Sequence, residues 1–279
     1  MPPLNIPALL RRFNLRPKKS LGQNFLMDEG ALAKVVAAAE LSADDTVLEI
    51  GPGLGSLTRR LAQAAGRVIA IELDQTFLPA LESVLKSYSN VQIIHGDILQ
   101  FPPSSFRLPP SYKVVANIPY YITSAVIRHL LEAEARPSRI VLTVQREVAE
   151  RMCAGPGEMS LLAVSVQFYS APKIAARLSA GAFYPRPEVD SAVVRLDVRP
   201  QPSVAVEEVE AFFRVVKAGF SQKRKQLRNA LSGGLQMENE AVDDALARAG
   251  IDPKRRAETL TLEEWDLLTD AIGKNERRG

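Results

Sequence analysis

The sequence contains few of the residues from which disulfide frameworks and metal sites are built. Its 279 residues include one cysteine, Cys153, and two histidines, His95 and His129. One cysteine cannot form an intrachain disulfide, and so few thiol and imidazole ligands do not favour a structural zinc site. The longest apolar run, SLLAVSVQF at 160–168, is far shorter than the roughly 18 residues of a membrane-spanning helix. These absences predict a soluble, cytoplasmic protein without a metal.

Net charge is also small, at +3, so charge alone does not indicate a nucleic-acid partner. The basic residues are unevenly distributed, however. No acid precedes Asp28, whereas the same stretch carries Arg11, Arg12, Arg16, Lys18 and Lys19. A second basic cluster is formed by Lys217, Lys223, Arg224, Lys225 and Arg228. By themselves these clusters fit a solvated surface as well as a phosphate-binding one.

Short β-rich runs alternate with helical patterns through the first half of the chain. Strands are predicted at 46–50, 67–73, 91–97, 112–117 and 139–145. The segments 55–65, 76–88 and 123–134 lie between them and carry apolar residues at helical spacing. Strands that are apolar on both faces and separated by helices indicate an α/β fold with a parallel sheet covered on both sides.

The second half of the chain changes character. Two further β-like runs, at 172–178 and 191–198, bracket the proline-rich FYPRPEVD and are expected to complete the sheet in antiparallel orientation. VRPQPS at 198–203 then introduces a tail patterned as helices. We therefore expect a basic N-terminal arm at 1–21, an α/β domain at 22–199 and a smaller helical domain at 200–279.

A glycine-rich turn follows the first predicted strand, in LEIGPGLGSLT at 48–58. Gly51 and Gly53 can adopt dihedral angles closed to other residues and let a ligand approach the backbone. Glu72 ends the second strand, 19 residues after Gly53, and a carboxylate at this place suits two ribose hydroxyls. A glycine turn followed by an acid occurs in NAD sites as well, so this pair leaves the cofactor open.

Two more strand ends separate the candidates. Asp97 follows the third strand, where an acid can accept a hydrogen bond from an adenine amino group, and Asn117 opens NIPYY after the fourth. Since open α/β sheets bind ligands beyond the carboxyl ends of their strands, Gly51, Glu72, Asp97 and Asn117 are expected to meet in one crevice. The combination favours S-adenosylmethionine over NAD.

With these motifs the chain resembles the ribosomal RNA adenine dimethyltransferases, and within them the small-subunit type. The similarity runs from about Lys18 to Trp265. It is carried by GQNFL at 22–26, EIGPGLGSLT at 49–58, IELD at 71–74, GD at 96–97, NIPYYIT at 117–123, FYPRPEVDSAVVRL at 183–196, FSQKRKQLRNAL at 220–231 and RAETLTLEEW at 256–265. The resemblance implies a Rossmann-like methyltransferase sheet with a smaller C-terminal helical domain.

The resemblance also implies residue roles. Asn24 and Leu26 would cover the cofactor, Gly51 would lie beside its methionine part, Glu72 would hold the ribose and Asp97 the adenine. Asn117 would lie between cofactor and target, and Phe183 would stack on the target base opposite Tyr120. The expected reaction is N6-dimethylation of two adjacent adenines near the 3′ end of small-subunit rRNA, on the RNA or an assembling subunit, by a monomer.

The residues of NIPYY suit this reaction. The exocyclic nitrogen of adenine attacks poorly because its lone pair is delocalised into the ring. The side-chain oxygen of Asn117 and a backbone carbonyl near Ile118 or Pro119 can accept its two N–H groups and aim the lone pair. Tyr120 offers a ring for stacking, at about 1–3 kcal/mol per base.

An adenine within an RNA helix must be unstacked to reach such a crevice. The two basic clusters are then best interpreted as phosphate contacts on either side of it. The residues expected to bind RNA are Arg16, Lys18, Lys19, Lys223, Arg224, Lys225 and Arg228.

Two departures from the family pattern and three alternatives remain at this point. Tyr121 stands where many relatives carry asparagine, and Glu188 where lysine is common, which puts a phosphate contact of that loop in doubt. A large-subunit dimethyltransferase of the antibiotic-resistance type shares the chemistry. A non-catalytic RNA- or DNA-binding factor shares the fold, although an intact NIPYY and Glu72 argue against it. An NAD-dependent dehydrogenase is the least favoured, because no hydride-transfer constellation is present.

Overall fold

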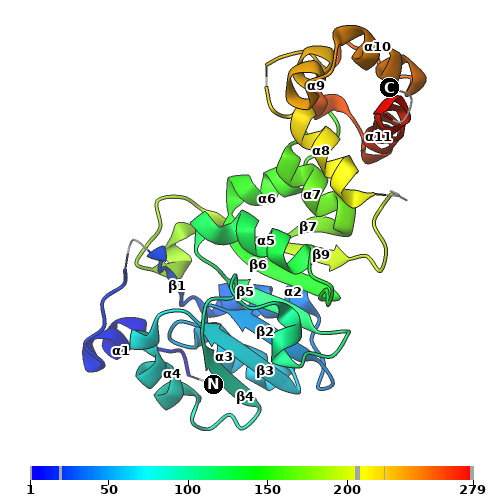
Figure 1. Cartoon of the computed structure of the whole chain (residues 1–279). Coiled ribbons are helices and arrows are strands. Elements are labelled where there is room, and N and C mark those ends of the chain that lie inside the picture. The colour runs from blue at the N-terminus through cyan, green and yellow to red at the C-terminus, as the bar shows by residue number, and fades with distance from the viewer. Residues whose placement is uncertain (1, 19–20, 205–207, 223, 277–279) are drawn as a thin grey trace. The chain divides into compact units, whose positions relative to one another are not determined.

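A computed structural model describes residues 2–18, 21–204, 208–222 and 224–276 (Figure 1). The chain divides into two compact units. The first comprises the residues up to Glu150 together with Ala171–Val198, and the second comprises Arg151–Ser170 together with the residues from Arg199 onward. No helix in the described part of the chain is long and apolar enough to cross a membrane.

The first unit is built on a seven-stranded sheet in the order β4-β3-β2-β5-β6-β9-β7. Neighbouring strands from β4 to β6 are parallel, and β9 pairs with β6 antiparallel. This confirms the α/β fold and the antiparallel completion of the sheet through β9. The strands are β2 (Thr46–Ile50), β3 (Arg67–Glu72), β4 (Val91–His95), β5 (Lys113–Asn117), β6 (Arg139–Gln145), β7 (Ser170–Leu178) and β9 (Ser191–Val198).

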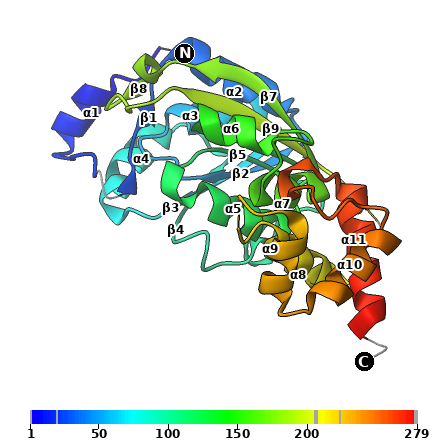
Figure 2. The same ribbon diagram turned by 90° about the horizontal axis from the view of Figure 1, so that it is seen from above.

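Helices cover the sheet on both faces (Figure 2). From β2 the chain first adds β3 and β4 on one side of the sheet, and β5 and β6 are then added on the other side. Since the crossover connections between parallel strands are right-handed, α3 and α4 lie on one face of the sheet and α5 lies on the other. The order reverses between β2 and β5, which is where open sheets of this kind bind ligands. The helices of this unit are α2 (Glu29–Ala39), α3 (Ser56–Ala64), α4 (Leu78–Leu85) and α5 (Thr123–Leu131), while α6 (Arg146–Met152) contains the boundary to the second unit.

The N-terminal segment is part of the first unit. Its helix α1 (Ile6–Arg12) buries Ile6 and Leu10 in a cluster with Leu54 and Phe77. Two short strands, β1 (Phe25–Leu26) and β8 (Phe183–Tyr184), then form a small antiparallel sheet. Within the segment expected as a basic N-terminal arm, 1–21, the apolar residues Ile6 and Leu10 of α1 thus pack into the first unit.

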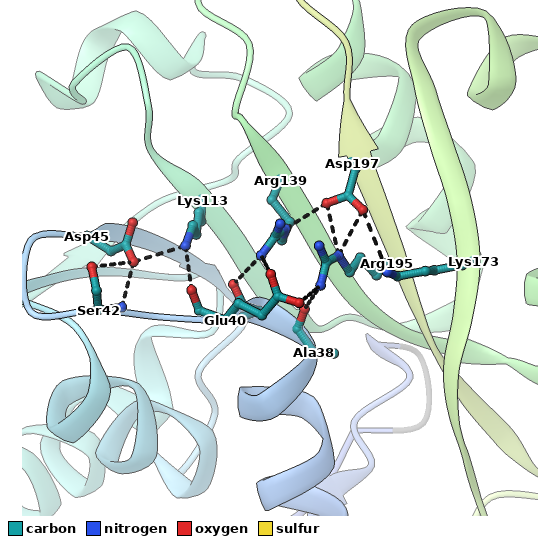
Figure 3. A network of polar contacts seen from close by, with 10 residues as sticks. Ala38, Glu40, Ser42, Asp45, Lys113, Arg139, Lys173, Arg195 and Asp197 are labelled. Atoms are coloured by element: carbon teal, nitrogen blue, oxygen red, sulfur yellow. Dashed lines mark hydrogen bonds and ion pairs between the residues drawn. The ribbon is translucent and has the colours of Figure 1, made fainter.

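A network of charged residues joins α2 to the sheet (Figure 3). Glu40 ends α2 in a left-handed conformation, with φ of 48°. Its carboxylate accepts hydrogen bonds from Arg139 on β6 and Arg195 on β9, and its carbonyl oxygen accepts one from the Lys113 ammonium on β5 at 2.7 Å. Asp197 binds both arginines. Lys113 and Arg139 begin their strands, so the network lies at the edge opposite the strand ends that carry the predicted site.

The second unit is a set of helices around a buried tryptophan. Trp265 is fully buried, and a Cβ atom added at Gly219 would lie 2.4 Å from its ring, so α8 requires glycine there to pack on α11. Thr261 and Glu264 form a capping box at the start of α11. The helices are α7 (Leu161–Tyr169), α8 (Val209–Gly219), α9 (Leu227–Leu235), α10 (Asn239–Arg248) and α11 (Leu262–Glu276).

The division between the units differs from the predicted boundary at 199/200 in two respects, the smaller of which is that Arg199 belongs to the second unit. Residues 151–170, expected in the α/β domain, belong to the second unit. Aromatic packing explains this: the ring of Phe168 on α7 stacks on Phe212 of α8 at 4.9 Å, with Phe213 against its edge at 5.1 Å. A helix that lies between two strands in sequence thus belongs to the core of the other unit.

Candidate active site

A cavity opens at the carboxyl edge of the parallel strands, within the first unit. It is lined by residues from five stretches of the chain, 21–26, 49–57, 71–74, 96–98 and 117–122. These are the segment around β1 and the ends of β2, β3, β4 and β5. Gly51, Glu72, Asp97 and Asn117 therefore meet in one crevice, as the sequence predicts.

The glycine turn leaves room in this cavity. Gly51 has φ of 69°, in the left-handed region, and a Cβ atom added to it would meet nothing within 4 Å. Gly53 also has positive φ, and its Cβ would lie 2.8 Å from the ring of Phe25. The turn thus presents bare backbone to the cavity at Gly51, while Gly53 allows the β1 segment to pass directly across it.

Glu72 holds the turn from the end of β3. Its Oε2 accepts a hydrogen bond from the Gly53 amide at 2.9 Å, and its Oε1 accepts one from the Asp74 amide at 2.8 Å. The side chain is buried, and burial raises the pKa of its carboxyl group. Each carboxylate oxygen has a further lone pair, so this arrangement is compatible with the predicted binding of ribose hydroxyls.

Asp97, after β4, is half-buried at the same edge. Its Oδ1 accepts a hydrogen bond from the Leu99 amide at 3.0 Å, in a local turn. This bond holds the carboxylate at the cavity wall, where the sequence predicts a partner for an adenine amino group.

Asn117 is the last residue of β5, and its amide is oriented by the segment that covers the cavity. Its Nδ2 donates to the carbonyl oxygen of Asn24 at 2.9 Å. Since the amide nitrogen is used in this way, its oxygen remains as the acceptor. Ile118 is buried next to it, and Pro119 has φ of −57° and ψ of 135°, which begins the short 3₁₀ turn at Tyr120–Ile122.

The two tyrosines of NIPYY differ in their surroundings. Tyr120 is half-buried, its hydroxyl lies 2.7 Å from the Ser191 hydroxyl at the start of β9, and burial raises its pKa. Tyr121 also lines the cavity, yet 62% of its surface is exposed.

Phe183 is not brought to the cavity. It is 2% exposed and packs in the hydrophobic core, where it pairs with Leu26 across the small sheet. Its neighbour Tyr184, on the other side of the strand, is 37% exposed. The predicted stacking of Phe183 on a base thus has no support from this arrangement of the ring.

Two acids that sequence reasoning missed also line the cavity. Glu49 interrupts the apolar strand TVLEI, is 1% exposed, and has a side-chain oxygen, Oε2, without a hydrogen-bond partner among the described residues. Burial, with a smaller contribution from the charge of Glu72, raises its pKa to about 8. An acid within an otherwise apolar strand is the signal that identifies it.

Asp74 is the second. It is 6% exposed and accepts hydrogen bonds from Lys18 Nζ at 3.0 Å, Gln23 Nε2 at 3.0 Å and Thr76 Oγ1 at 2.7 Å. Burial raises its pKa, but these three partners lower it to about 2. Lys18, predicted to bind a phosphate, thus links the segment before β1 to the end of β3.

The other residues expected to bind RNA lie outside the cavity. Arg16 is exposed in the first unit, and Arg224 and Lys225 are exposed in the second. Arg228 forms an ion pair with Asp243 at 2.8 Å. Lys19 and Lys223 lie outside the described residues.

The charges of the cavity indicate its ligand. The ionisable acidic and basic side chains that line it in the described part of the chain are all acids: Glu49, Glu72, Asp74 and Asp97. Because the pKa of Glu49 is raised to about 8, its carboxyl group is mostly protonated at neutral pH, and the negative charge of the cavity comes from the other acids. The pyrophosphate of NAD would meet these carboxylates unfavourably, whereas S-adenosylmethionine carries a sulfonium and an ammonium group. The residues present therefore fit S-adenosylmethionine. No group of histidine, cysteine or acidic side chains able to hold a metal ion occurs among the described residues.

Comparison with known proteins agrees with this site. Residues 14–274 match the family model for Ribosomal RNA adenine dimethylase. The chain belongs to the ribosomal RNA adenine dimethylase family. Membership confirms the methyltransferase fold and S-adenosylmethionine as the cofactor.

Individual relatives cover nearly the whole chain. Ribosomal RNA small subunit methyltransferase A of Dehalococcoides mccartyi is 49% identical over 264 residues, 93% of this chain and 90% of that protein. Among solved structures, a dimethyladenosine transferase from Plasmodium falciparum has a TM-score of 0.76 at 25% identity and covers 90% of this chain and 98% of its own. The 23S rRNA methyltransferase ErmE has a TM-score of 0.70 at 29% identity and covers 90% of this chain and 100% of its own.

Proposed function

We propose that this protein transfers methyl groups from S-adenosylmethionine to N6 of two adjacent adenines near the 3′ end of small-subunit rRNA. The observation that carries the proposal is the amide of Asn117, whose nitrogen is bound to the Asn24 carbonyl so that its oxygen is left as an acceptor in an acid-lined cavity. The small-subunit relatives support the choice of RNA, since they are considerably more similar to this chain than the large-subunit enzyme.

The bound cofactor supplies a methyl group that is electrophilic because it is attached to a sulfonium. The protein's task is therefore to hold the two partners and to orient the adenine. We assign the cofactor's ribose to Glu72, its adenine to Asp97 and its methionine part to the open space at Gly51, with Asn24 and Leu26 covering it.

Orientation of the adenine is assigned to the first four residues of NIPYY, Asn117 to Tyr120. The oxygen of Asn117 accepts one N–H of the exocyclic amine, and the carbonyl of Ile118 or Pro119 accepts the other, which turns the nitrogen lone pair toward the methyl group. Tyr120 stacks on the base, and its hydroxyl contact with Ser191 holds the ring in place. Phe183 takes the opposite face of the base only if its ring leaves the core.

RNA binding outside the cavity is assigned to exposed cations of both units, Arg16, Arg224 and Lys225, with Lys19 and Lys223 as further candidates. Lys18 and Arg228 are weaker candidates because both are already paired with acids. The partner is the small-subunit rRNA or an assembling small subunit, and we place the protein in the cytoplasm as a monomer.

The test compares small-subunit rRNA from cells with and without the gene. Primer extension stops at dimethyladenosine, so we expect two adjacent stops near the 3′ end that vanish on deletion and return with the wild-type gene. Return of the stops with the Asn117→Ala variant, or stops on large-subunit RNA instead, would contradict the proposal.

A further inference from the structure

Tyr121 is a large exposed ring at the mouth of the cavity. It directly follows Tyr120 and lines the same cavity, but its surface is 62% exposed, the highest value among the exposed large apolar side chains of the described residues. A single exposed aromatic residue needs no explanation on most surfaces. This one is distinguished by its place, because it stands at the entrance that an extruded base must pass.

The backbone around Tyr121 holds the ring in this position. Pro119 restricts the chain before the turn, and the turn at Tyr120–Ile122 leads into α5. Gly22, with φ of 58°, lies against it: a Cβ atom added there would be 3.1 Å from Pro119 Cβ and 3.5 Å from Tyr121 Cδ1. One edge of the ring is thus supported by the covering segment, while most of its surface faces solvent.

We propose that Tyr121 stacks on the nucleotide next to the adenine that is being methylated. The inference rests on the proposed function, since it needs a base extruded into this cavity. Extrusion removes the target from the base stack and leaves one face of its neighbour uncovered. An aromatic ring at the cavity mouth covers that face, and stacking suits any base because every base has a π-face.

The two tyrosines then have different tasks. Tyr120, half-buried and tied to Ser191, contacts the reacting base, whereas Tyr121 contacts its neighbour and acts on binding of the RNA. Because the two target adenines are adjacent, the base that stacks on Tyr121 is itself a target adenine while one of the two is being methylated. Loss of the Tyr121 ring should therefore weaken RNA binding and leave the rate of transfer from the bound complex nearly unchanged.

The first measurement uses Tyr121→Leu, which keeps a side chain of moderate size, and Tyr121→Phe, which keeps the ring. The probe is an RNA hairpin with the sequence around the two target adenines. We expect Tyr121→Leu to raise Kd and KM for this RNA about 5- to 100-fold, with kcat and the Kd for S-adenosylmethionine within a few-fold. Tyr121→Phe should resemble wild type. A phenylalanine variant as weak as the leucine variant would overturn the proposal.

The second measurement identifies the partner of the ring. Hairpins that lack the base 5′ or 3′ of one target adenine are compared with the intact hairpin, for wild type and for Tyr121→Leu. At one of the two positions, removal of the base should weaken the binding of the RNA to the wild-type protein. The same removal should not further weaken its binding to Tyr121→Leu, because the base and the ring form one contact that either change removes. Independent, additive losses at both positions would overturn the proposal.

Failure of the proposed function gives a different result. If wild-type protein transfers no methyl group to adenine N6 in small-subunit RNA, the proposed function and this inference fall together. If wild type transfers methyl groups and Tyr121→Leu binds the RNA equally well, only this inference falls.

Discussion

At the scale of single residues, the site depends on polar groups whose hydrogen bonds to the backbone decide what remains for a ligand. The side-chain amide nitrogen of Asn117 donates a hydrogen bond to the carbonyl oxygen of Asn24, and the side-chain oxygen remains available as an acceptor. Glu72 uses one lone pair of each oxygen on the Gly53 and Asp74 amides. Polar groups held in place in this way need little rearrangement when charge shifts in a reaction, so the proposed function predicts that the Asn117 amide contributes strongly to the rate.

Glu49 supplies a prediction about pH. Its pKa is raised from 4.5 to about 8 by burial, so between these values the folded protein keeps a proton that the unfolded chain has lost. The free energy of unfolding should therefore fall as the pH rises from about 5 to 8, by roughly 4 kcal/mol in all. Glu49→Gln should remove this decrease, as measured by urea unfolding followed by circular dichroism.

The matched control for this prediction is Glu82→Gln, on the exposed side of α4. It should leave the wild-type pH dependence in place. A Glu49→Gln variant with the same decrease as wild type would show that this carboxyl group is ionised in the folded protein at neutral pH.

Much of the site could be predicted at this scale, and the exceptions have physical reasons. Gly51, Glu72, Asp97 and Asn117 follow parallel strands, so sequence position alone brings them to one edge. Phe183 could not be placed, because side chains alternate between the faces of a strand. A difference of one residue decides whether Phe183 or Tyr184 enters the core, and the pairing partner Leu26 lies far away in sequence.

At the scale of elements, the segment at 21–26 is held across the cavity at two points. Asp74 binds Lys18 and Gln23 on one side, and Asn117 binds the Asn24 carbonyl on the other. Both anchors belong to the carboxyl edge of the sheet. The segment at 21–26 is therefore oriented by residues that themselves line the cavity.

Asp74→Asn tests this connection. The change removes the negative charge that binds Lys18. It should weaken the attachment of the segment by only about 1 kcal/mol, because the lysine is half exposed and its charge is screened by solvent. We expect roughly 3- to 10-fold weaker binding of S-adenosylmethionine by calorimetry and faster hydrogen exchange at the amides of 22–26. Asp44→Asn, exposed near the opposite edge of the sheet, is the control. Unchanged exchange in Asp74→Asn would mean that the segment is held by β1 alone.

The strands are easier to predict than the helices. β2, β6 and β9 have the predicted bounds, because their apolar runs end at polar or turn-forming residues. No helix is predicted from the sequence at α1, α2 or α7. The buried residues of α1 pack near β1, and those of α2 pack against the main sheet. Whether α7 belongs to the first or the second unit depends on its contact with aromatic rings of α8, far along the chain. The spacing of Ile6 and Leu10 suits a helix, but the local sequence does not show which elements these side chains contact.

At the scale of the whole molecule, the proposed function gives the two units different tasks. The first contains the cavity, and the second contributes exposed cations on and after α8. Replacing Lys223, Arg224 and Lys225 by glutamine should weaken RNA binding and reduce the slope of log affinity against log salt by about one unit for each phosphate that is no longer neutralised. Affinity for S-adenosylmethionine should not change.

The control for this prediction keeps the charges, with Arg224→Lys and Lys225→Arg in one variant. It should retain the wild-type salt slope within error, because phosphate binding of this kind depends mainly on charge. An unaltered slope in the glutamine variant would assign these residues to a solvated surface.

The most direct test of the account is the rate of methyl transfer in a single turnover, with RNA and S-adenosylmethionine both saturating, for wild type and Asn117→Ala. The alanine removes one of the two acceptors that orient the adenine amine and leaves Tyr120 and Glu72 in place. We expect the rate to fall by about 10²–10³, with both affinities within a few-fold of wild type. A variant that keeps more than about a tenth of the wild-type rate would contradict the account, because the amide would then serve only to hold the segment around Asn24.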